Sequence, residues 1–214
     1  TFSSRGLGDV YKRQINFLSE KGFEEHITWN NLYEKVCKFS NYLKKVSLKR
    51  GDRIAAYVPN KIETIISFLA CAKNGIIWSS CSPDFGVQGV VDRFKQIEPK
   101  VLITSDYYFY NGKKINILDK VDEVLKQIPS IKKVIVYNYY KKEKENLKNF
   151  IDFEETLKIE TDESFERFEF NHPIYILFSS GTTGKPKCIT HGTGNVIIEH
   201  NKEFMLHCDI RDNE

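Results

Sequence analysis

The sequence predicts an α/β fold built around a parallel β-sheet. Short apolar runs rich in β-branched residues alternate with longer amphipathic segments, which is the pattern of parallel strands joined by helices. The hydrophobic content of 41% and the charged content of 29% are typical of globular proteins. With 214 residues, the chain is long enough for one large domain.

The first elements follow from the apolar periodicity after residue 15. Thr28 is a suitable N-cap for a helix with one apolar face. That face consists of Leu32, Val36, Phe39, Leu43 and Val46. A turn and a buried strand at residues 54–58 come next. The following helix starts near Ile62, where Asn60 and Glu63 form a variant of the capping box, and it ends at Gly75.

The same alternation continues over the next part of the chain. We expect strands at residues 76–78, 101–104 and 133–137, and helices at residues 87–97 and 115–128. Residues 138–170 are rich in Lys, Glu and other polar residues. They predict a solvated polar linker with a short helix near residues 150–157, and not a binding surface. A buried strand at residues 174–178 then leads into the most informative segment.

Charge and cysteine usage exclude several classes of function. Much of the net charge of +3 lies in residues 1–14, which carry Arg5, Lys12 and Arg13 against Asp9, so the pI is no argument for nucleic-acid binding. The five cysteines form no C-x-x-C pair and predict scattered buried thiols in a reducing, cytoplasmic compartment, with no disulfide and no metal site. No apolar run approaches the ~20 residues that cross a bilayer, so we expect no membrane insertion.

The two ends of the chain differ from its middle. Residues 1–14 show no helix or strand period, and we interpret them as a non-native tail. The only methionine is Met205. Residues 211–214 form a polar turn without a closing element. We therefore expect residues 15–214 to be part of a longer domain whose carboxyl-terminal remainder is missing.

Residues 179–187, Ser-Ser-Gly-Thr-Thr-Gly-Lys-Pro-Lys, carry the chemistry. Glycines let the backbone approach a phosphate, hydroxyls donate hydrogen bonds, and lysines offset negative charge. The segment therefore predicts binding of the β- and γ-phosphates of ATP. A Walker A loop would need Gly in place of Ser179, and the G-x-G-x-x-G pattern that starts at Gly192 fails at Ile197.

This loop resembles the signature loop of the adenylate-forming enzymes, which include acyl-CoA synthetases, luciferases and the adenylation domains of peptide synthetases. Other segments look like the acid–CoA ligases of this superfamily that act on acetoacetate. They are residues 78–89, 92–94, 96–100, 110–113 and 187–192. The likeness covers about residues 15–214. It implies the large amino-terminal domain of these enzymes, with a first sheet subdomain nearly whole and a second sheet subdomain only begun at the loop.

The resemblance also implies a reaction and its sites. Acetoacetate would attack the α-phosphate of ATP to give an acyl-adenylate and pyrophosphate, and coenzyme A (CoA) would then displace AMP to form acetoacetyl-CoA. The residues implied in ATP phosphate binding, with Mg²⁺, are Ser179, Ser180, Gly181, Thr182, Thr183, Gly184 and Lys187. Trp78, Ser79 and Ser80 would belong to the wall of the CoA tunnel, and Lys113 would lie near the 3′-phosphate of CoA. The competing interpretation of Trp78 is the end of a buried strand, and that of Lys113 is a solvated turn.

Two alternatives remain open at this level. The acid could instead be acetate or propionate, or the chain could be a non-catalytic MgATP-binding module. His191, which follows the loop, has a structural role by default. The catalytic lysine of the family lies in the small carboxyl-terminal domain, so no catalytic residue is expected within these 214 residues. We expect this piece of a lipid- and ketone-body-metabolising ligase to be inactive and poorly soluble alone.

Overall fold

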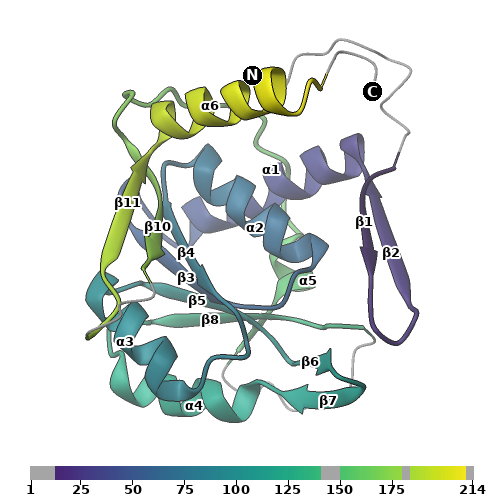
Figure 1. Ribbon diagram of the computed structural model, residues 1–214, viewed down its shortest axis with the longest axis vertical. Helices are drawn as coiled ribbons and strands as arrows, with labels where there is room; N and C mark the ends of the chain where they lie inside the picture. Colours follow the sequence, from purple (N-terminus) through teal and green to yellow (C-terminus); the bar gives the residue numbers. More distant parts are fainter. Residues whose placement is uncertain (1–12, 141–149, 180–183, 211–214) are drawn as a thin grey trace.

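The computed structural model describes residues 13–140, 150–179 and 184–210, and its centre is a mostly parallel seven-stranded sheet (Figure 1). Its strands are β3 (Arg53–Tyr57), β4 (Ile77–Cys81), β5 (Val101–Ser105), β8 (Lys133–Tyr137), β9 (Ile151–Asp152), β10 (Pro173–Phe178) and β11 (Cys188–Gly192). They lie in the order β11-β10-β4-β3-β5-β8-β9. Only β11 is antiparallel to its neighbour. The predicted α/β fold with a parallel sheet is confirmed.

Helices cover both faces of the sheet. They are α1 (Trp29–Lys45), α2 (Ile62–Lys73) and α5 (Phe153–Thr156) on one face, and α3 (Val87–Ile97) and α4 (Leu118–Gln127) on the other. Strand β3 shows why both faces need cover. Ile54 and Ala56 pack with α1 and α2, while Ala55 and Tyr57 pack with α3 and α4, because successive side chains of a strand point to opposite faces.

Two hairpins that the periodicity did not predict lie outside this sheet. They are β1 (Arg13–Leu18) with β2 (Glu24–Thr28), and β6 (Tyr107–Tyr110) with β7 (Lys113–Asn116). The expected boundary at residue 15 falls inside β1. The helix expected at residues 115–128 starts only at Leu118, because Ile115 belongs to β7. Asn111 and Gly112 have φ of 49° and 73°, as a tight hairpin turn requires.

Several local predictions can be checked directly. The Thr28 cap is confirmed, since its side chain accepts a hydrogen bond from the Asn31 amide at 3.3 Å. The capping role of Asn60 is wrong: Lys61 occupies the N-cap position of α2, and no side chain caps that helix end. The strand expected at residues 76–78 extends to Cys81.

The expected linker at residues 138–170 contributes to the core where it is described. The predicted short helix is confirmed as α5, but β9 before it pairs with β8 and joins the sheet. Phe153 is fully buried, and so is Thr156. The strands in which we expected a second sheet continue the first one, because β10 pairs with β4 through Tyr175 and Trp78.

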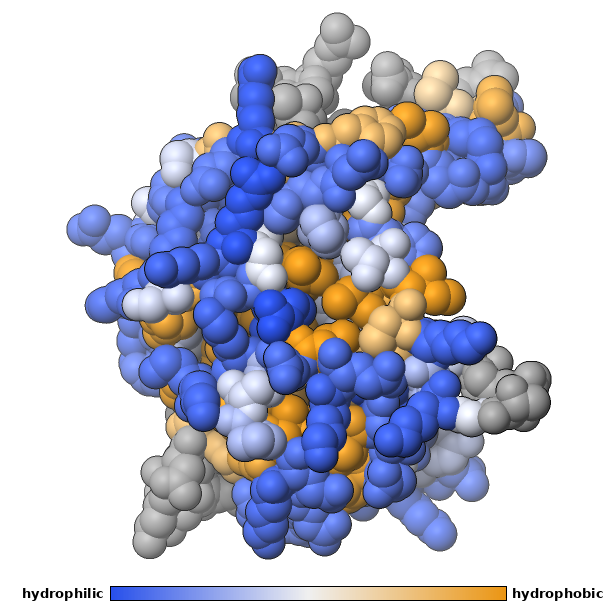
Figure 2. Space-filling model, turned by 90° about the vertical axis from the view of Figure 1, so that its left-hand side faces the viewer, coloured by the Kyte–Doolittle hydropathy of each residue, from blue (hydrophilic) through white to orange (hydrophobic). Residues whose placement is uncertain are grey.

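The last part of the chain leaves apolar side chains at the surface. It comprises β10, β11, α6 (Thr193–Lys202) and the short π-helix η1 (Glu203–His207). Exposed apolar residues here are Leu177, Ile189, Ile197, Ile198, Phe204, Met205 and Leu206. Figure 2 shows orange apolar atoms reaching the surface among polar ones. Cys188 and Cys208 are also exposed, so the prediction of buried thiols holds only for Cys37, Cys71 and Cys81. Poor solubility remains a prediction.

Two further findings concern the described ranges only. No helix there combines the length and apolar character that are needed to cross a membrane. No group of three or more His, Cys, Asp or Glu side chains there could hold a metal ion.

Candidate functional site

The candidate site lies at the edge of the sheet where the parallel strands end. The chain passes from β3 to β4 on one side of β3, and it then crosses back over β3 to form β5 on the other side. Open α/β sheets bind ligands outside the carboxyl ends of their strands, near such a reversal. The segment at residues 179–187 follows β10, which runs parallel to β4, so it leaves the sheet at this same edge.

The two ends of this segment are fastened to each other. The Ser179 amide donates to the Lys187 carbonyl oxygen at 3.1 Å, and the Lys187 amide donates to Ser179 Oγ at 3.3 Å. Ser180, Gly181, Thr182 and Thr183 lie outside the described residues. Gly184, Lys185 and Lys187 are exposed, so the lysine amines can reach a ligand in solution.

Contacts from two other elements support this stem. Ser79 on β4 is buried and donates to the carbonyl oxygen of Ile176 on β10 at 2.8 Å. Gln96 on α3 donates to the Pro186 carbonyl oxygen at 2.9 Å. The strand before the segment is therefore attached to β4, and the end of the segment is attached to α3.

Trp78 and Ser79, which we expected in a CoA tunnel wall, are both buried. Trp78 is 6% exposed and Ser79 is 1% exposed. The Trp78 ring lies edge-on to Phe68, 6.1 Å away. Ser80 alone is exposed. It lines a cleft of about 250 Å³ formed by residues 58–60, Thr64 and residues 80–83.

His191 continues the same aromatic row, and its structural role stays a prediction. Its ring lies 4.9 Å from that of Tyr175, and the Tyr175 ring lies 6.2 Å from that of Phe68. The row therefore joins β11, β10 and α2, and it fixes the strands that precede and follow the loop.

The hairpin that carries Lys113 is joined to the loop that follows Ser80, through residues to which the sequence assigned no role in CoA binding. The Tyr108 hydroxyl on β6 donates to Asp84 Oδ1 in the loop after β4 at 2.8 Å. Burial, and then the bond to Asp84, raise the pKa of Tyr108, so its hydroxyl stays protonated as a donor. The Tyr57 hydroxyl also lies 2.9 Å from the Pro83 carbonyl oxygen in this loop. Lys113 is exposed at the start of β7.

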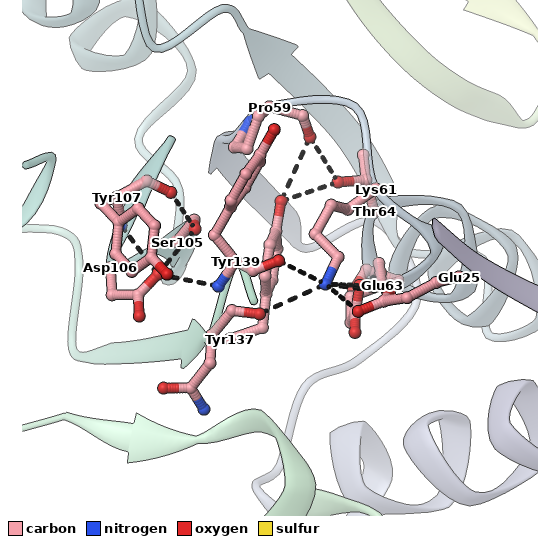
Figure 3. A network of polar contacts seen from close by, with 12 residues as sticks. Glu25, Pro59, Lys61, Glu63, Thr64, Ser105, Asp106, Tyr107, Tyr137 and Tyr139 are labelled. Carbon is pink, nitrogen blue, oxygen red and sulfur yellow. Dashed lines mark hydrogen bonds and ion pairs between the residues drawn. The ribbon is translucent and has the colours of Figure 1, made fainter. Parts of the chain in front are cut away.

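A buried lysine at the same sheet edge was not found from the sequence. The Lys61 side chain is 1% exposed, and its amine lies 3.0 Å from Glu25 and 3.6 Å from Glu63. It also donates to the carbonyl oxygens of Asn138 and Tyr139 at 3.3 and 2.9 Å (Figure 3). Burial raises the pKa of Glu63, and the Lys61 charge opposes that rise. This ion cluster joins hairpin β1–β2 to the ends of β3 and β8.

Asp106 fixes the neighbouring strand ends. Its Oδ1 accepts the amides of Tyr107 at 2.7 Å and Tyr139 at 2.8 Å (Figure 3). Burial raises the pKa of this carboxyl group, and the two amides oppose the rise. Asp106 therefore holds the ends of β5 and β8 together.

Comparison with known proteins agrees with the fold. The model of the family described as AMP-binding enzyme matches residues 10–212. The chain belongs to this family of adenylate-forming enzymes. Acetoacetyl-CoA synthetases are among its most similar relatives. The one from Rhizobium meliloti is 43% identical over 98% of this chain and 32% of its own length. The one from Xenopus tropicalis is 44% identical over 86% of this chain and 29% of its own length.

A solved structure and a further relative extend the comparison. The acetoacetyl-CoA synthetase from Streptomyces lividans superimposes with a TM-score of 0.87 at 35% identity, over 92% of this chain and 30% of that one. A malonamoyl-CoA synthetase from Penicillium aethiopicum is 36% identical over 91% of this chain and 28% of its own length. The chain thus spans about 30% of the length of its relatives.

Proposed function

We propose that this chain is the phosphate-binding and CoA-binding part of an ATP-dependent acid–CoA ligase. The reaction is acetoacetate + ATP + CoA to acetoacetyl-CoA + AMP + pyrophosphate, through an acyl-adenylate. The observation that carries the proposal is the stem of the phosphate loop, where Ser179 and Lys187 close the loop at the ligand-binding edge of a fold that belongs to the AMP-binding enzymes.

In the first step, a carboxylate oxygen of the acid bonds to the α-phosphorus of ATP, and the bond to the pyrophosphate oxygen breaks. Negative charge grows on the leaving pyrophosphate. The Lys187 amine offsets this charge, and the sheet edge holds its backbone in place. Mg²⁺ suits such a site because it keeps several waters and binds through substrate phosphates rather than through a protein cage. The CoA thiolate then attacks the acyl carbon, and AMP leaves.

The relatives suggest what kind of acid the ligase takes. Acetoacetate and malonamate, the acids named by the relatives, are both short carboxylates with a carbonyl group at C3. They differ only in a methyl group against an amide nitrogen. We therefore propose a 3-oxo carboxylate as the substrate class, with acetoacetate as its first member.

A panel of acids tests this proposal in the complete ligase that contains this chain. We expect ATP–pyrophosphate exchange with acetoacetate to exceed that with butyrate by about 10-fold or more, because a site that hydrogen-bonds a C3 carbonyl would be left with unpaired polar groups by butyrate. Malonamate should rank between them. Equal or faster exchange with acetate, propionate or butyrate would exclude the 3-oxo preference. Tight MgATP binding with no exchange for any acid would instead favour a non-catalytic module.

The bond between Tyr108 and Asp84 gives a separate prediction for CoA. Tyr108→Phe removes the hydroxyl that joins hairpin β6–β7 to the loop after β4. We expect the KM for CoA to rise about 3- to 10-fold, with pyrophosphate exchange unchanged. Tyr42→Phe on α1 is the matched control, because Tyr42 lines a hollow with Lys133 at the start of β8, at the opposite edge of the sheet. A change in exchange without a change in the KM for CoA would refute the assignment.

A further inference from the structure

The backbone on both sides of Lys187 is fixed by three hydrogen bonds. Two come from Ser179, whose Oγ accepts the Lys187 amide at 3.3 Å and whose amide donates to the Lys187 carbonyl oxygen at 3.1 Å. The third fixes the preceding peptide group, since Gln96 Nε2 donates to the Pro186 carbonyl oxygen at 2.9 Å. With these groups held, the direction in which the Lys187 side chain leaves the backbone is set.

Gln96 differs from Ser179 in where it comes from. Ser179 directly follows β10, so it moves together with the hairpin that carries Lys187. Gln96 lies on α3, whose Val90 and Phe94 are fully buried against the face of the sheet that α3 and α4 cover. Among the hydrogen bonds of the described residues, Gln96 makes the link from α3 to the stem of the loop.

The amide group of Gln96 is itself held in one orientation. Its nitrogen donates to the Asp92 carbonyl oxygen at 2.6 Å as well as to Pro186, and its oxygen accepts from Cys188 Sγ at 3.6 Å. Both donors and the acceptor of the amide are used. The opposite orientation would place the amide oxygen against two carbonyl oxygens, which repel it.

We propose that Gln96 is a positioning residue for nucleotide binding, which aims Lys187 at the polyphosphate by holding the Pro186 peptide against α3. The proposal rests on the proposed function, because it takes Lys187 to meet a polyphosphate. Lys187 is exposed, and its amine has no carboxylate partner within the described ranges. An unheld stem would let this amine sample directions away from the phosphates, and the ligand would have to select the productive one.

The experiment uses the complete ligase with Gln96→Met, which keeps the side chain's length and removes its hydrogen bonds. We expect the KM for MgATP in pyrophosphate exchange to rise about 2- to 10-fold. The KM values for the acid and for CoA, and the melting temperature, should stay unchanged. Gln96→Glu should raise the KM for MgATP further, because a carboxylate cannot donate to Pro186 and repels the polyphosphate.

Gln88→Met is the matched control. Gln88 is exposed on the same helix, and its amide bonds only within α3, to Asp92 Oδ1 at 2.7 Å. Its substitution should leave all KM values unchanged. In the double variant Gln96→Met with Lys187→Ala, the loss of Gln96 should add no further rise in KM, because Gln96 acts through Lys187.

The outcomes separate this inference from the proposed function. If Lys187→Ala raises the KM for MgATP but Gln96→Met behaves like Gln88→Met, the role of Gln96 is overturned and the proposed function stands. If Gln96→Met raises every KM and lowers the melting temperature, Gln96 only stabilises the fold and the inference fails. If Lys187→Ala changes nothing, the proposed function fails, and the role of Gln96 fails with it.

Discussion

Replacing Lys187 with Ala should lower the rate of ATP–pyrophosphate exchange in the complete ligase by about 100-fold. The reason is electrostatic. The charge on the leaving pyrophosphate increases as its bond to the α-phosphorus breaks, so an amine that is fixed beside it stabilises the transition state more than bound ATP. The fixed backbone around Lys187, with bonds from Ser179 and Gln96, means that little reorganisation is needed during the reaction.

Two further variants make this measurement specific. Lys187→Arg keeps the positive charge and should lose less activity than Lys187→Ala, although the planar guanidinium differs in geometry from an amine. Lys95→Ala removes an exposed lysine of α3 and should leave the exchange rate unchanged. Equal rates for Lys187→Ala and Lys95→Ala would show that the loop does not meet the polyphosphate in this way.

The sequence predicted those features that depend on neighbouring residues. The phosphate loop is contiguous, so its glycines, hydroxyls and lysines can be recognised without knowledge of the fold. Helix α3 was predicted with the observed bounds of residues 87–97, because its apolar period is clear and Gly86 precedes it. The same holds for β8 at residues 133–137. In these segments the local pattern and the tertiary environment favour the same structure.

Hairpin β6–β7 shows where a local signal was outweighed by another one. The Asn111-Gly112 pair is a strong indicator of a tight turn between strands. The apolar period that begins at Ile115 was extended into a helix instead, although Ile115 pairs with Tyr108 in the hairpin. Both residues of this pair have φ above zero in the structure. An Asn-Gly pair in the sequence should therefore take precedence over the first turn of an expected helix.

Contacts between distant residues could not be predicted from one sequence. Gln96 and Pro186 are 90 positions apart, and Lys61 and Tyr139 are 78 positions apart. A glutamine or lysine on a helix or at its N-cap is usually a solvated residue, and nothing local distinguishes these two. The fold creates both contacts, because it places segments that are far apart in the sequence next to each other.

The buried cluster around Lys61 carries the largest expected effect on stability. Lys61→Met should lower the free energy of unfolding by about 3 kcal/mol, because it leaves the buried Glu63 carboxylate and two carbonyl oxygens without their cation. The pKa of Glu63, already raised by burial, should rise further. Urea unfolding of the chain, followed by the fluorescence of the half-exposed Trp29 and the buried Trp78, measures the change.

An exposed ion pair on α1 provides the matched comparison. Lys38 pairs with Glu34 one helical turn away, and the Glu34 side chain is 53% exposed. Lys38→Met should therefore change stability by only about 0.5 kcal/mol or less. Adding Glu63→Gln to Lys61→Met should recover part of the loss, because the neutral amide leaves no uncompensated charge in the interior. If Lys61→Met and Lys38→Met unfolded at the same urea concentration, the Lys61 cluster would not hold hairpin β1–β2 against the sheet. The ends of β3 and β8 would then depend on apolar packing, on Asp106, and on the hydrogen bonds of the Tyr137 hydroxyl with Pro59 and Thr64.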